Sequence, residues 1–483
     1  MPYLAKLEKA GIPTVLVDLE DQEQMVLEES LASGIPNLRY LHASRTLPGP
    51  EDIDNWIEPM LDALTRPLTE KEKESGMHNP PQPRILFEGT LEEAETFYMQ
   101  VKHIPHPVNA PMAVYTDGFP IVVPTEERVK EMLTGTSHRP DELITYQTDR
   151  AGMGRDVRKA GETVRFHPRL WTATVEKVAT VAVMAGCKPE HLPVVLAIAE
   201  CGCNIGSTHF NGQWVCLSGP IVKELGLNTG CGMLGPGSPV NTPIGRTYQL
   251  LAINLGGAIT GVNRMNSLGS PFANGGVCIG ENADGLPPGW KGLNEECGFK
   301  KDESIVWIMN GLSNIVGDRF SPGGYRALQK SGHGGMARRL GVKGVPGPHN
   351  WLEFILPELF SIGDGRSGFT FIMIPEMAQH LYDYGFKTKE AVYKYIWEKS
   401  FIPLGEYRHL SWPDLVTNGW LGIEPRSGKH WKELPDDYMV PATGSPQPNQ
   451  HNIIIGGGDE EVCQCLTGRP ASFNPSYSID AWR

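Results

Sequence analysis

The sequence lacks the features that would assign it directly to a membrane, secreted or nucleic-acid-binding class. No apolar run approaches the roughly 18 residues that a membrane-spanning helix needs, and the N-terminal stretch MPYLAKLEKAGIPT has no apolar signal-peptide core. We therefore expect a cytoplasmic protein that does not engage a membrane. Lys and Arg number 43 against 56 Asp and Glu, a formal charge of −13, which argues against a nucleic-acid partner.

Several familiar catalytic and binding motifs are also missing. There is no CxxC pair, which a zinc ribbon would need, and no nucleophile elbow, Ser-His-Asp order or Walker loop. No GxGxxG run follows a strand-like segment. The nine cysteines are an odd number in a large chain, so we expect free thiols and no disulfide framework.

The first 72 residues have the pattern of a small α/β domain. Helical segments at 2–10, 20–31 and 53–64 alternate with strand-like segments at 14–19 and 39–42. This alternation is typical of a doubly wound parallel sheet. The pattern opens within a helix, where such a domain would begin with a strand, so we expect an incomplete Rossmann-like domain over 1–72.

The rest of the 483 residues predicts a linker followed by a large domain. Residues 73–165 are predicted to form a linker and docking segment, with a strand at 84–89 and helices from Leu91 and Thr125. Residues 166–483 predict a large mixed α/β domain with long Gly-rich loops. Its expected helices are 174–184, 191–200, 376–384 and 388–399, and its expected strands are 304–309, 368–374 and 452–455.

The stretch 200–290 is the strongest candidate for a functional site. Glycine recurs every few residues, and five of the nine cysteines lie in it. Glycine at this density weakens helices and strands and indicates tight turns whose backbone can approach a ligand closely. Two apolar runs, 214–217 and 250–255, are predicted to be buried strands or helix segments that hold these turns.

Six polar residues of this stretch, with one upstream of it, are candidates for catalysis or substrate binding. His209 and Glu281 are candidate proton carriers, because imidazole and carboxylate are the usual general acids and bases. Arg246 is a candidate anchor for a substrate carboxylate, since a guanidinium forks to two oxygens. Further substrate-binding candidates are Asn241, Thr242, Asn282 and Asp117. For each residue a structural role as a cap, a turn or a buried polar group stays open.

The cysteines offer a nucleophile and a weaker metal site. Cys231, on the glycine turn TGCGMLGPG, is the best reactive thiol of the chain. Cys201-Gly-Cys203 and Cys463-Gln-Cys465 are CxC pairs. Cys201, Cys203 and Cys278 are weak candidates for metal ligands, with inert buried thiols as the alternative.

Long ordered strings run through nearly the whole chain: TDGFPIVVPTEERVKEMLTGT, SGPIVKELGLNTGCGMLGPG, NTPIGR, NLGGA, CIGEN and EMAQHLYDYGFKTKEAVYKYIWEKSFIPLGEY. These strings resemble the UGSC-motif (seleno)protein family. That family is named for a selenocysteine- or cysteine-Gly-Ser-Cys loop before the helix that leads into GIPT. No CGSC occurs in this sequence. The N-terminal part is also distantly similar to the selenocysteine subunit of glycine and proline reductases.

The resemblance implies a thiol- or selenol-dependent enzyme whose nucleophile is carried by a small partner subunit with a CGSC- or UGSC-type loop. This chain would be the large subunit of a hetero-oligomer that cleaves a carbon–heteroatom bond of a small polar substrate, reductively or by nucleophilic attack. No cofactor beyond the partner's Cys or Sec is implied. Two alternatives stay open: a metal-dependent hydratase or lyase with Cys, His and Glu ligands, and a non-catalytic scaffold subunit for a redox partner.

Overall fold

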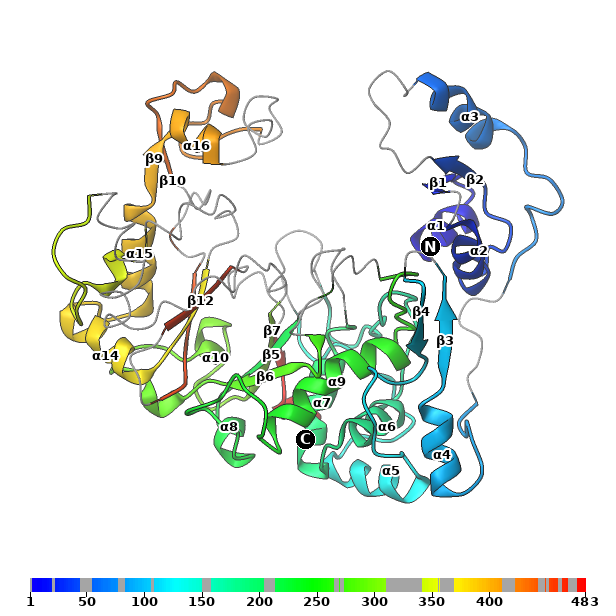
Figure 1. Cartoon of the computed structure of the whole chain (residues 1–483), viewed down its shortest axis with the longest axis horizontal. Helices are drawn as coiled ribbons and strands as arrows, with labels where there is room; N and C mark the ends of the chain where they lie inside the picture. Colours follow the sequence, from blue (N-terminus) through cyan, green and yellow to red (C-terminus); the bar gives the residue numbers. More distant parts are fainter. Residues whose placement is uncertain are drawn as a thin grey trace.

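The computed structural model shows a mixed α/β protein (Figure 1). It describes residues 2–19, 22–43, 54–76, 83–105, 108–149, 158–203, 213–264, 269, 273–309, 341–354, 356, 369–410, 422–441, 448, 451–458, 463–467 and 476–483. In this part of the chain no helix combines the length and apolarity needed to cross a membrane.

The N-terminal elements form a small two-stranded unit. They are α1 (Pro2–Lys9), β1 (Leu16–Leu19), α2 (Glu23–Ala32), β2 (Tyr40–Ala43) and α3 (Asp54–Thr65). Strands β1 and β2 pair in parallel, and α3 runs through Pro59. The predicted alternation of helices and strands is therefore confirmed. Figure 1 shows this unit above one end of the main body.

Residues 91–132 add short elements to the edge of the main body. They comprise α4 (Leu91–Tyr98), the antiparallel pair β3 (Val101–Ile104) and β4 (Ala110–Ala113), and α5 (Glu126–Met132). Thr90 and Thr125 cap the two helices by accepting backbone N–H groups. Tyr98 and Met132 are buried in the same hydrophobic cluster as the central helices. This part of the predicted linker therefore contributes to the main core.

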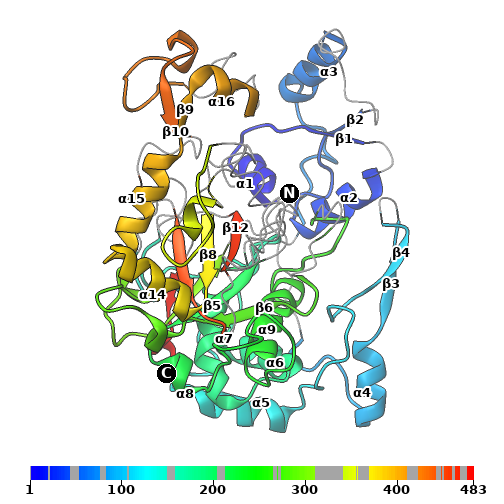
Figure 2. The same cartoon turned by 60° about the vertical axis from the view of Figure 1, so that its left-hand side comes forward.

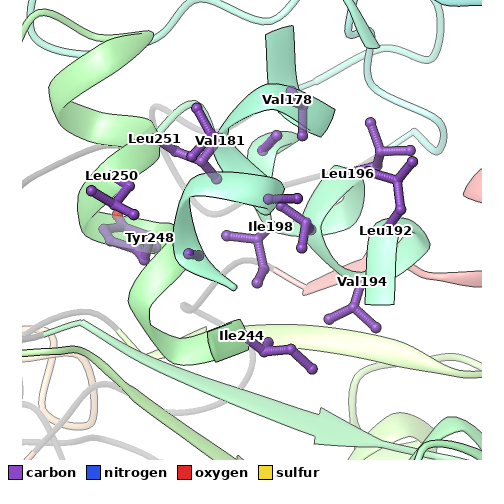
Figure 3. Packing of buried hydrophobic residues seen from close by; sticks show 14 of the residues in the cluster. Val178, Val181, Leu192, Val194, Leu196, Ile198, Ile244, Tyr248, Leu250 and Leu251 are labelled. Carbon is purple, nitrogen blue, oxygen red and sulfur yellow. The ribbon is translucent and has the colours of Figure 1, made fainter. Parts of the chain in front are cut away.

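The main core is built around three helices, of which the sequence predicted the first two. They are α6 (Val175–Ala185), which Thr174 caps and Gly186 ends in a left-handed conformation, α7 (Leu192–Ala199) and α9 (Asn241–Asn254). Every residue of α7 is buried, so this helix is apolar all round, as expected inside a large core. Figure 3 shows Leu196 and Ile198 of α7 among side chains of α6 and α9.

A four-stranded mixed sheet lies beside these helices. Its order is β13 (Ser476–Ser478), β7 (Ile305–Met309), β5 (Trp214–Ser218), β6 (Val277–Gly280); β5 and β6 are parallel and the other pairs antiparallel. The connection from β5 to β6 passes through α8 (Ile221–Glu224) and α9. All five residues of β5 and of β7 are buried, which is expected only when both faces of a sheet are covered.

The alternation of side chains shows what covers each face. Val215 and Leu217 of β5 belong to the cluster of α6, α7 and α9, whereas Trp214 and Cys216 pack in a second cluster with Ile372. That residue belongs to a second sheet of order β11 (Asn452–Ile455), β8 (Phe369–Met373), β12 (Cys463–Thr467). Successive strand residues point to opposite faces, so the two sheets lie face to face.

The second sheet is in turn covered by helices. Phe371 and Met373 of β8 pack with side chains of α14 (Pro375–Tyr384) and α15 (Lys389–Lys399). The body thus has four layers: α6, α7 and α9, then two sheets, then α14 and α15. Figure 2 shows the same order from another side. Three smaller elements, β9 (Phe401–Pro403), α16 (Leu404–Leu410) and β10 (Met439–Pro441), extend beyond α15, and α10 (Leu293–Glu296) lies before β7.

Two predictions of local structure need comment. The strand expected at 84–89 is wrong: these residues form no ladder, and Ile85 and Leu86 are exposed. An apolar run becomes a strand only where another strand offers its hydrogen bonds. The run 250–255, left open between strand and helix, lies largely at the end of α9.

Candidate functional site

A groove of about 710 Å³ opens where the parallel strands β5 and β6 end. In open α/β sheets ligands bind beyond the carboxyl ends of the strands, which makes this groove the leading candidate site. It lies beside the second sheet as well, because Asn282 N donates to Ile455 O at the end of β11 (2.7 Å). Its polar or charged lining side chains are Ser218, Lys223, Thr229, Glu281, Asn282, Asp284, Asn294, Glu295 and Lys301, and Trp290 lines it with an aromatic ring.

The floor of the groove is a compact hydrogen-bonded set. Ser218 Oγ donates to Glu281 Oε2 (2.8 Å), and the backbone N–H of Leu293 donates to the same oxygen (2.6 Å). Asn294 N donates to Ser218 Oγ (3.1 Å). Ser218 is the last residue of β5 and Glu281 directly follows β6, and the parallel register that pairs Leu217 with Gly280 brings these two next residues side by side.

Behind this floor Glu281 is held by a buried lysine from the far helical layer. Lys389 Nζ lies 3.2 Å from Glu281 Oε1 and 2.9 Å from Glu296 Oε2, and it donates to Ile453 O. Burial opposes the charge of Lys389, but the two carboxylates outweigh burial and raise its pKa. Burial raises the pKa of Glu296, whose Oε1 accepts from Tyr393 Oη. Glu281 is therefore a paired carboxylate, and its predicted role in proton transfer stays a prediction.

Thr229, which lines the groove, begins a glycine turn that contacts a second glycine turn. Gly457 N donates to Thr229 O (2.8 Å), which joins the turn 229–233 to the turn 456–458. A Cβ on Gly456 would lie 2.4 Å from Met233 Sδ, so only glycine allows this approach. Cys231 lies on the first turn. Among the cysteines whose side chains the structure describes, Cys231 alone is exposed.

Asn241 fastens this turn to strand β6. Its Oδ1 accepts from Asn228 N (2.9 Å) and from Ser238 Oγ, and its Nδ2 donates to the carbonyls of Asn228 and Cys278. All four of these contacts are internal, and the side chain is buried, so the contacts favour the structural role left open for Asn241. Thr242 is exposed in the first turn of α9.

The other predicted binding residues divide between the groove and a separate ion pair. Asn282 lines the groove and also accepts from Gly285 N through Oδ1 (3.3 Å). Arg246 binds Asp117 through two hydrogen bonds of 2.9 and 2.7 Å. The guanidinium thus has the forked geometry that the sequence suggested, but the two oxygens belong to the protein. Neither Arg246 nor Asp117 lines the groove.

The remaining candidates lie elsewhere or outside the described residues. His209 falls in 204–212, which the structure does not describe. Cys278 is buried, and burial raises the pKa of its thiol. Within the described ranges no group of three His, Cys, Asp or Glu side chains could hold a metal ion. The Cys201–Cys203 pair is buried at the end of α7, and none of its atoms lines the groove.

Sequence reasoning missed Ser218, Asn294 and Lys389. Ser218 ends a buried apolar run, and the position of a polar residue directly after such a strand was a usable signal. Lys389 follows the capping residue Thr388 at the start of an ordinary helix. No local pattern marks its burial, because the carboxylates that pair with it lie 108 and 93 residues away in the sequence.

Comparison with protein-family models, with curated proteins and with solved structures found no match to this chain. The assignment of a site therefore depends on the geometry of the groove and on the chemistry of its residues.

Proposed function

We propose that this chain is the substrate-binding subunit of a thiol- or selenol-dependent enzyme that cleaves a carbon–heteroatom bond of a small polar molecule. The observation that carries the proposal is the groove at the ends of β5 and β6, one of whose lining residues, Thr229, begins the turn that bears the exposed thiol of Cys231. Its volume suits a small molecule. The resemblance to the UGSC-motif family motivates the thiol or selenol part.

The lining side chains suit a polar, uncharged or zwitterionic substrate. Asn282 and the hydroxyl of Thr229 offer both donors and acceptors. Lys223 and Lys301 stand with Asp284 and Glu295 around the same groove, so both signs of charge are present. Ser218 and Glu281 sit at the floor, where the hydroxyl and the carboxylate share a hydrogen bond. A substrate group that reached Ser218 would compete for that bond.

Binding is tested with one groove-filling variant and one matched control. Ala283 is an exposed alanine that lines the groove, and Ala160 is an exposed alanine on a turn outside it. The melting temperatures of wild type, Ala283→Trp and Ala160→Trp are measured against a panel of small carboxylates, amides, thioethers and amino acids. A ligand of the groove stabilises wild type and Ala160→Trp but not Ala283→Trp. If every stabilising compound acts equally on all three proteins, the groove is not the binding site.

A partner subunit forms the second part of the proposal. The N-terminal unit has a parallel sheet of only two strands among its described residues, and parallel sheets are normally covered on both faces. Large apolar side chains of this unit are exposed, including Tyr3, Ile12, Leu31, Ile57 and Leu61. We propose that a small subunit with a CGSC- or UGSC-type loop completes this sheet and delivers its nucleophile to the groove.

Native mass spectrometry of the protein from its source organism tests this second part. A complex of this chain with a smaller polypeptide supports it, and a pure homo-oligomer contradicts it. If a complex forms and turns over a substrate, Cys231→Ser separates the two sources of the nucleophile. Loss of turnover assigns the attack to Cys231, and unchanged turnover assigns it to the partner. If turnover is also unchanged in Ala283→Trp, the groove is not used and this chain acts as a non-catalytic scaffold subunit.

A further inference from the structure

A second chemical centre lies where helix α7 ends, away from the residues that line the groove. After Glu200 the chain turns through Cys201, Gly202 and Cys203, and the last two have φ angles of 64° and 48°. A positive φ costs glycine little but is uncommon for cysteine. This turn brings the backbone N–H of Cys203 within 3.2 Å of Cys201 Sγ. Backbone strain of this kind often occurs at functional residues.

The two thiols of this turn interact directly. Their side chains hydrogen-bond each other, which favours one thiolate and one thiol over two neutral groups. Burial alone would raise the pKa of Cys201, but the two hydrogen bonds from Cys203 and the charge of Arg158 together lower it. Burial and the neighbouring sulfur raise the pKa of Cys203. Cys201 is 7% exposed and Cys203 is 0% exposed, so the more accessible sulfur is also the more acidic one.

A buried cation without a carboxylate partner stands beside the pair. Arg264 is 8% exposed, and its Nη1 donates to the neutral amide oxygen of Gln249 (3.0 Å). Its Nε has no hydrogen-bond partner among the described residues. A buried charge is costly unless an opposite charge accompanies it. The electrostatic partners of Arg264 are Cys203 and the buried hydroxyl of Tyr248, so the Cys203 sulfur, once it loses its proton, is the counter-charge that the described residues offer.

Two sulfurs can serve a soft metal or a disulfide, and the surroundings favour the disulfide. In the ranges that the structure describes, no third His, Cys, Asp or Glu joins the pair to make a metal-binding group. Zinc sites in proteins use three or four such ligands. A thiolate stabilised by cations, with a second thiol in contact, is instead the arrangement of a dithiol that exchanges with disulfides.

We propose that Cys201 and Cys203 form a redox-active dithiol that reduces small disulfides. The Cys201 thiolate attacks one sulfur of the disulfide, forming a mixed disulfide and releasing one substrate thiolate. The Cys203 thiol loses its proton and attacks Cys201 Sγ, closing the Cys201–Cys203 disulfide and releasing the second thiolate. The proton that Cys203 loses ends on one released thiolate, solvent supplies the proton of the other, and two electrons pass from the protein to the disulfide. The proposal does not depend on the function assigned to the groove.

Peptide mapping after exposure to glutathione disulfide tests this assignment. The full-length, reduced protein carries Cys231→Ser so that the exposed thiol does not contribute, and free thiols are trapped with N-ethylmaleimide before digestion. We expect the peptide that contains both cysteines to lose two hydrogens and to escape alkylation. With Cys203→Ser added, glutathione stays attached to Cys201; with Cys201→Ser added, it attaches to neither position.

Two further measurements separate a redox pair from inert buried thiols. Arg264→Gln should slow closure of the Cys201–Cys203 disulfide from the mixed disulfide by about tenfold or more, and Arg264→Lys should restore part of that rate, because the charge of Arg264 favours deprotonation of the Cys203 thiol that attacks in this step. Cys278 is the matched internal control, since it is a buried thiol in the same core whose pKa is raised by burial and by the neighbouring Cys187. If Cys201 and Cys203 react no faster than Cys278, or if purified protein holds a stoichiometric metal on them, the proposal is wrong. All of these measurements detect peptide masses, so their outcome does not depend on whether the groove binds a substrate.

Discussion

Arg246 and Asp117 form a two-point ion pair across 129 residues of sequence, with Nε 2.9 Å from Oδ2 and Nη2 2.7 Å from Oδ1. Their side chains are 14% and 6% exposed. Nη2 also donates to Phe119 O. The pair joins the loop before α5 to helix α9. The two residues were each predicted to bind substrate, and in the structure they satisfy one another.

We predict that this ion pair stabilises the fold. Arg246→Met should lower the free energy of unfolding by about 2–4 kcal/mol, because it leaves the buried carboxylate of Asp117 without its cation. The double variant with Asp117→Asn should be less damaging than the two single changes added together. Denaturant unfolding measures these values. Arg139→Met is the control, because Arg139 and Asp141 form an ion pair that is 76% exposed at both residues. If Arg246→Met is as stable as wild type and changes ligand binding, this prediction is wrong and Arg246 binds substrate.

Lys389 should be the most sensitive lysine of the groove region. Lys389→Met leaves Glu281 and Glu296 buried without their shared cation and should lower the free energy of unfolding by about 3–5 kcal/mol. Lys394→Met is the matched control on the same helix, where the ion pair to Glu398 is exposed, and it should change stability by less than about 0.5 kcal/mol. The free energies of unfolding of both variants, measured by chemical denaturation, test this prediction. Adding Glu296→Gln to Lys389→Met should recover part of the loss; a further loss would contradict this account of the network.

Glu200 should make stability depend on pH. Trp482 Nε1 and Gln147 N donate to its carboxylate, but burial outweighs these bonds and raises its pKa from 4.5 to about 7. A carboxyl group with a raised folded pKa holds its proton longer in the folded state. Its favourable contribution is therefore complete below about pH 4.5 and is lost as the pH rises to about 7.

The unfolding free energy of wild type minus that of Glu200→Gln isolates this group. We expect the difference to fall by roughly 2–3 kcal/mol between pH 5 and pH 8, from about 1.4 kcal/mol for each pH unit of the window. Glu131→Gln removes an exposed carboxyl group and should give a difference that is flat over the same range. A flat difference for Glu200→Gln would show that its carboxyl group is not desolvated.

Gly245 should be irreplaceable where α9 crosses strand β6. A Cβ at this position would lie 2.8 Å from the backbone nitrogen of Cys278, and a Cβ on Gly276 would lie 2.2 Å from Gly245 O. Gly245→Ala should therefore cost about 1–3 kcal/mol by forcing the helix and strand apart. Gly230→Ala is the control, since its Cβ would meet nothing closer than 3.8 Å. Thermal unfolding compares the two, and equal stability would mean that the helix shifts freely.

The fold could be predicted element by element but not layer by layer. Thr174 and Gly186 mark the ends of α6 in the sequence, and the alternation at 2–64 gives the N-terminal helices and strands. Strand alternation puts Trp214 and Val215 on opposite faces, but nothing local says which layer covers each face, because all five residues of β5 are apolar or small. That assignment needs the second sheet, whose strands lie more than 140 residues further along the chain.

The candidate site, too, could be predicted only in part from the sequence. The prediction that 200–290 carries a site led to Glu281 and Asn282, which line the groove, and to Cys231, which lies on the turn that begins at the groove residue Thr229. Arg246 has the forked geometry that the sequence suggested, with Asp117 as its partner. The sequence left that partner open, because it shows what a guanidinium can bind but not which carboxylate reaches it first. His209 lies outside the described residues, and its role stays a prediction.

The sequence by itself determined the helix ends, the apolar strands, the glycine turns and the free thiols, since each of these depends on the conformational preferences or the chemistry of a few neighbouring residues. The tertiary structure alone decided that two sheets lie face to face, that Lys389 pairs with Glu281, and that Arg264, which has no carboxylate partner among the described residues, interacts with Cys203. Those facts depend on contacts between residues tens to hundreds of positions apart, and burial, which gives such contacts their strength, exists only once the chain has folded.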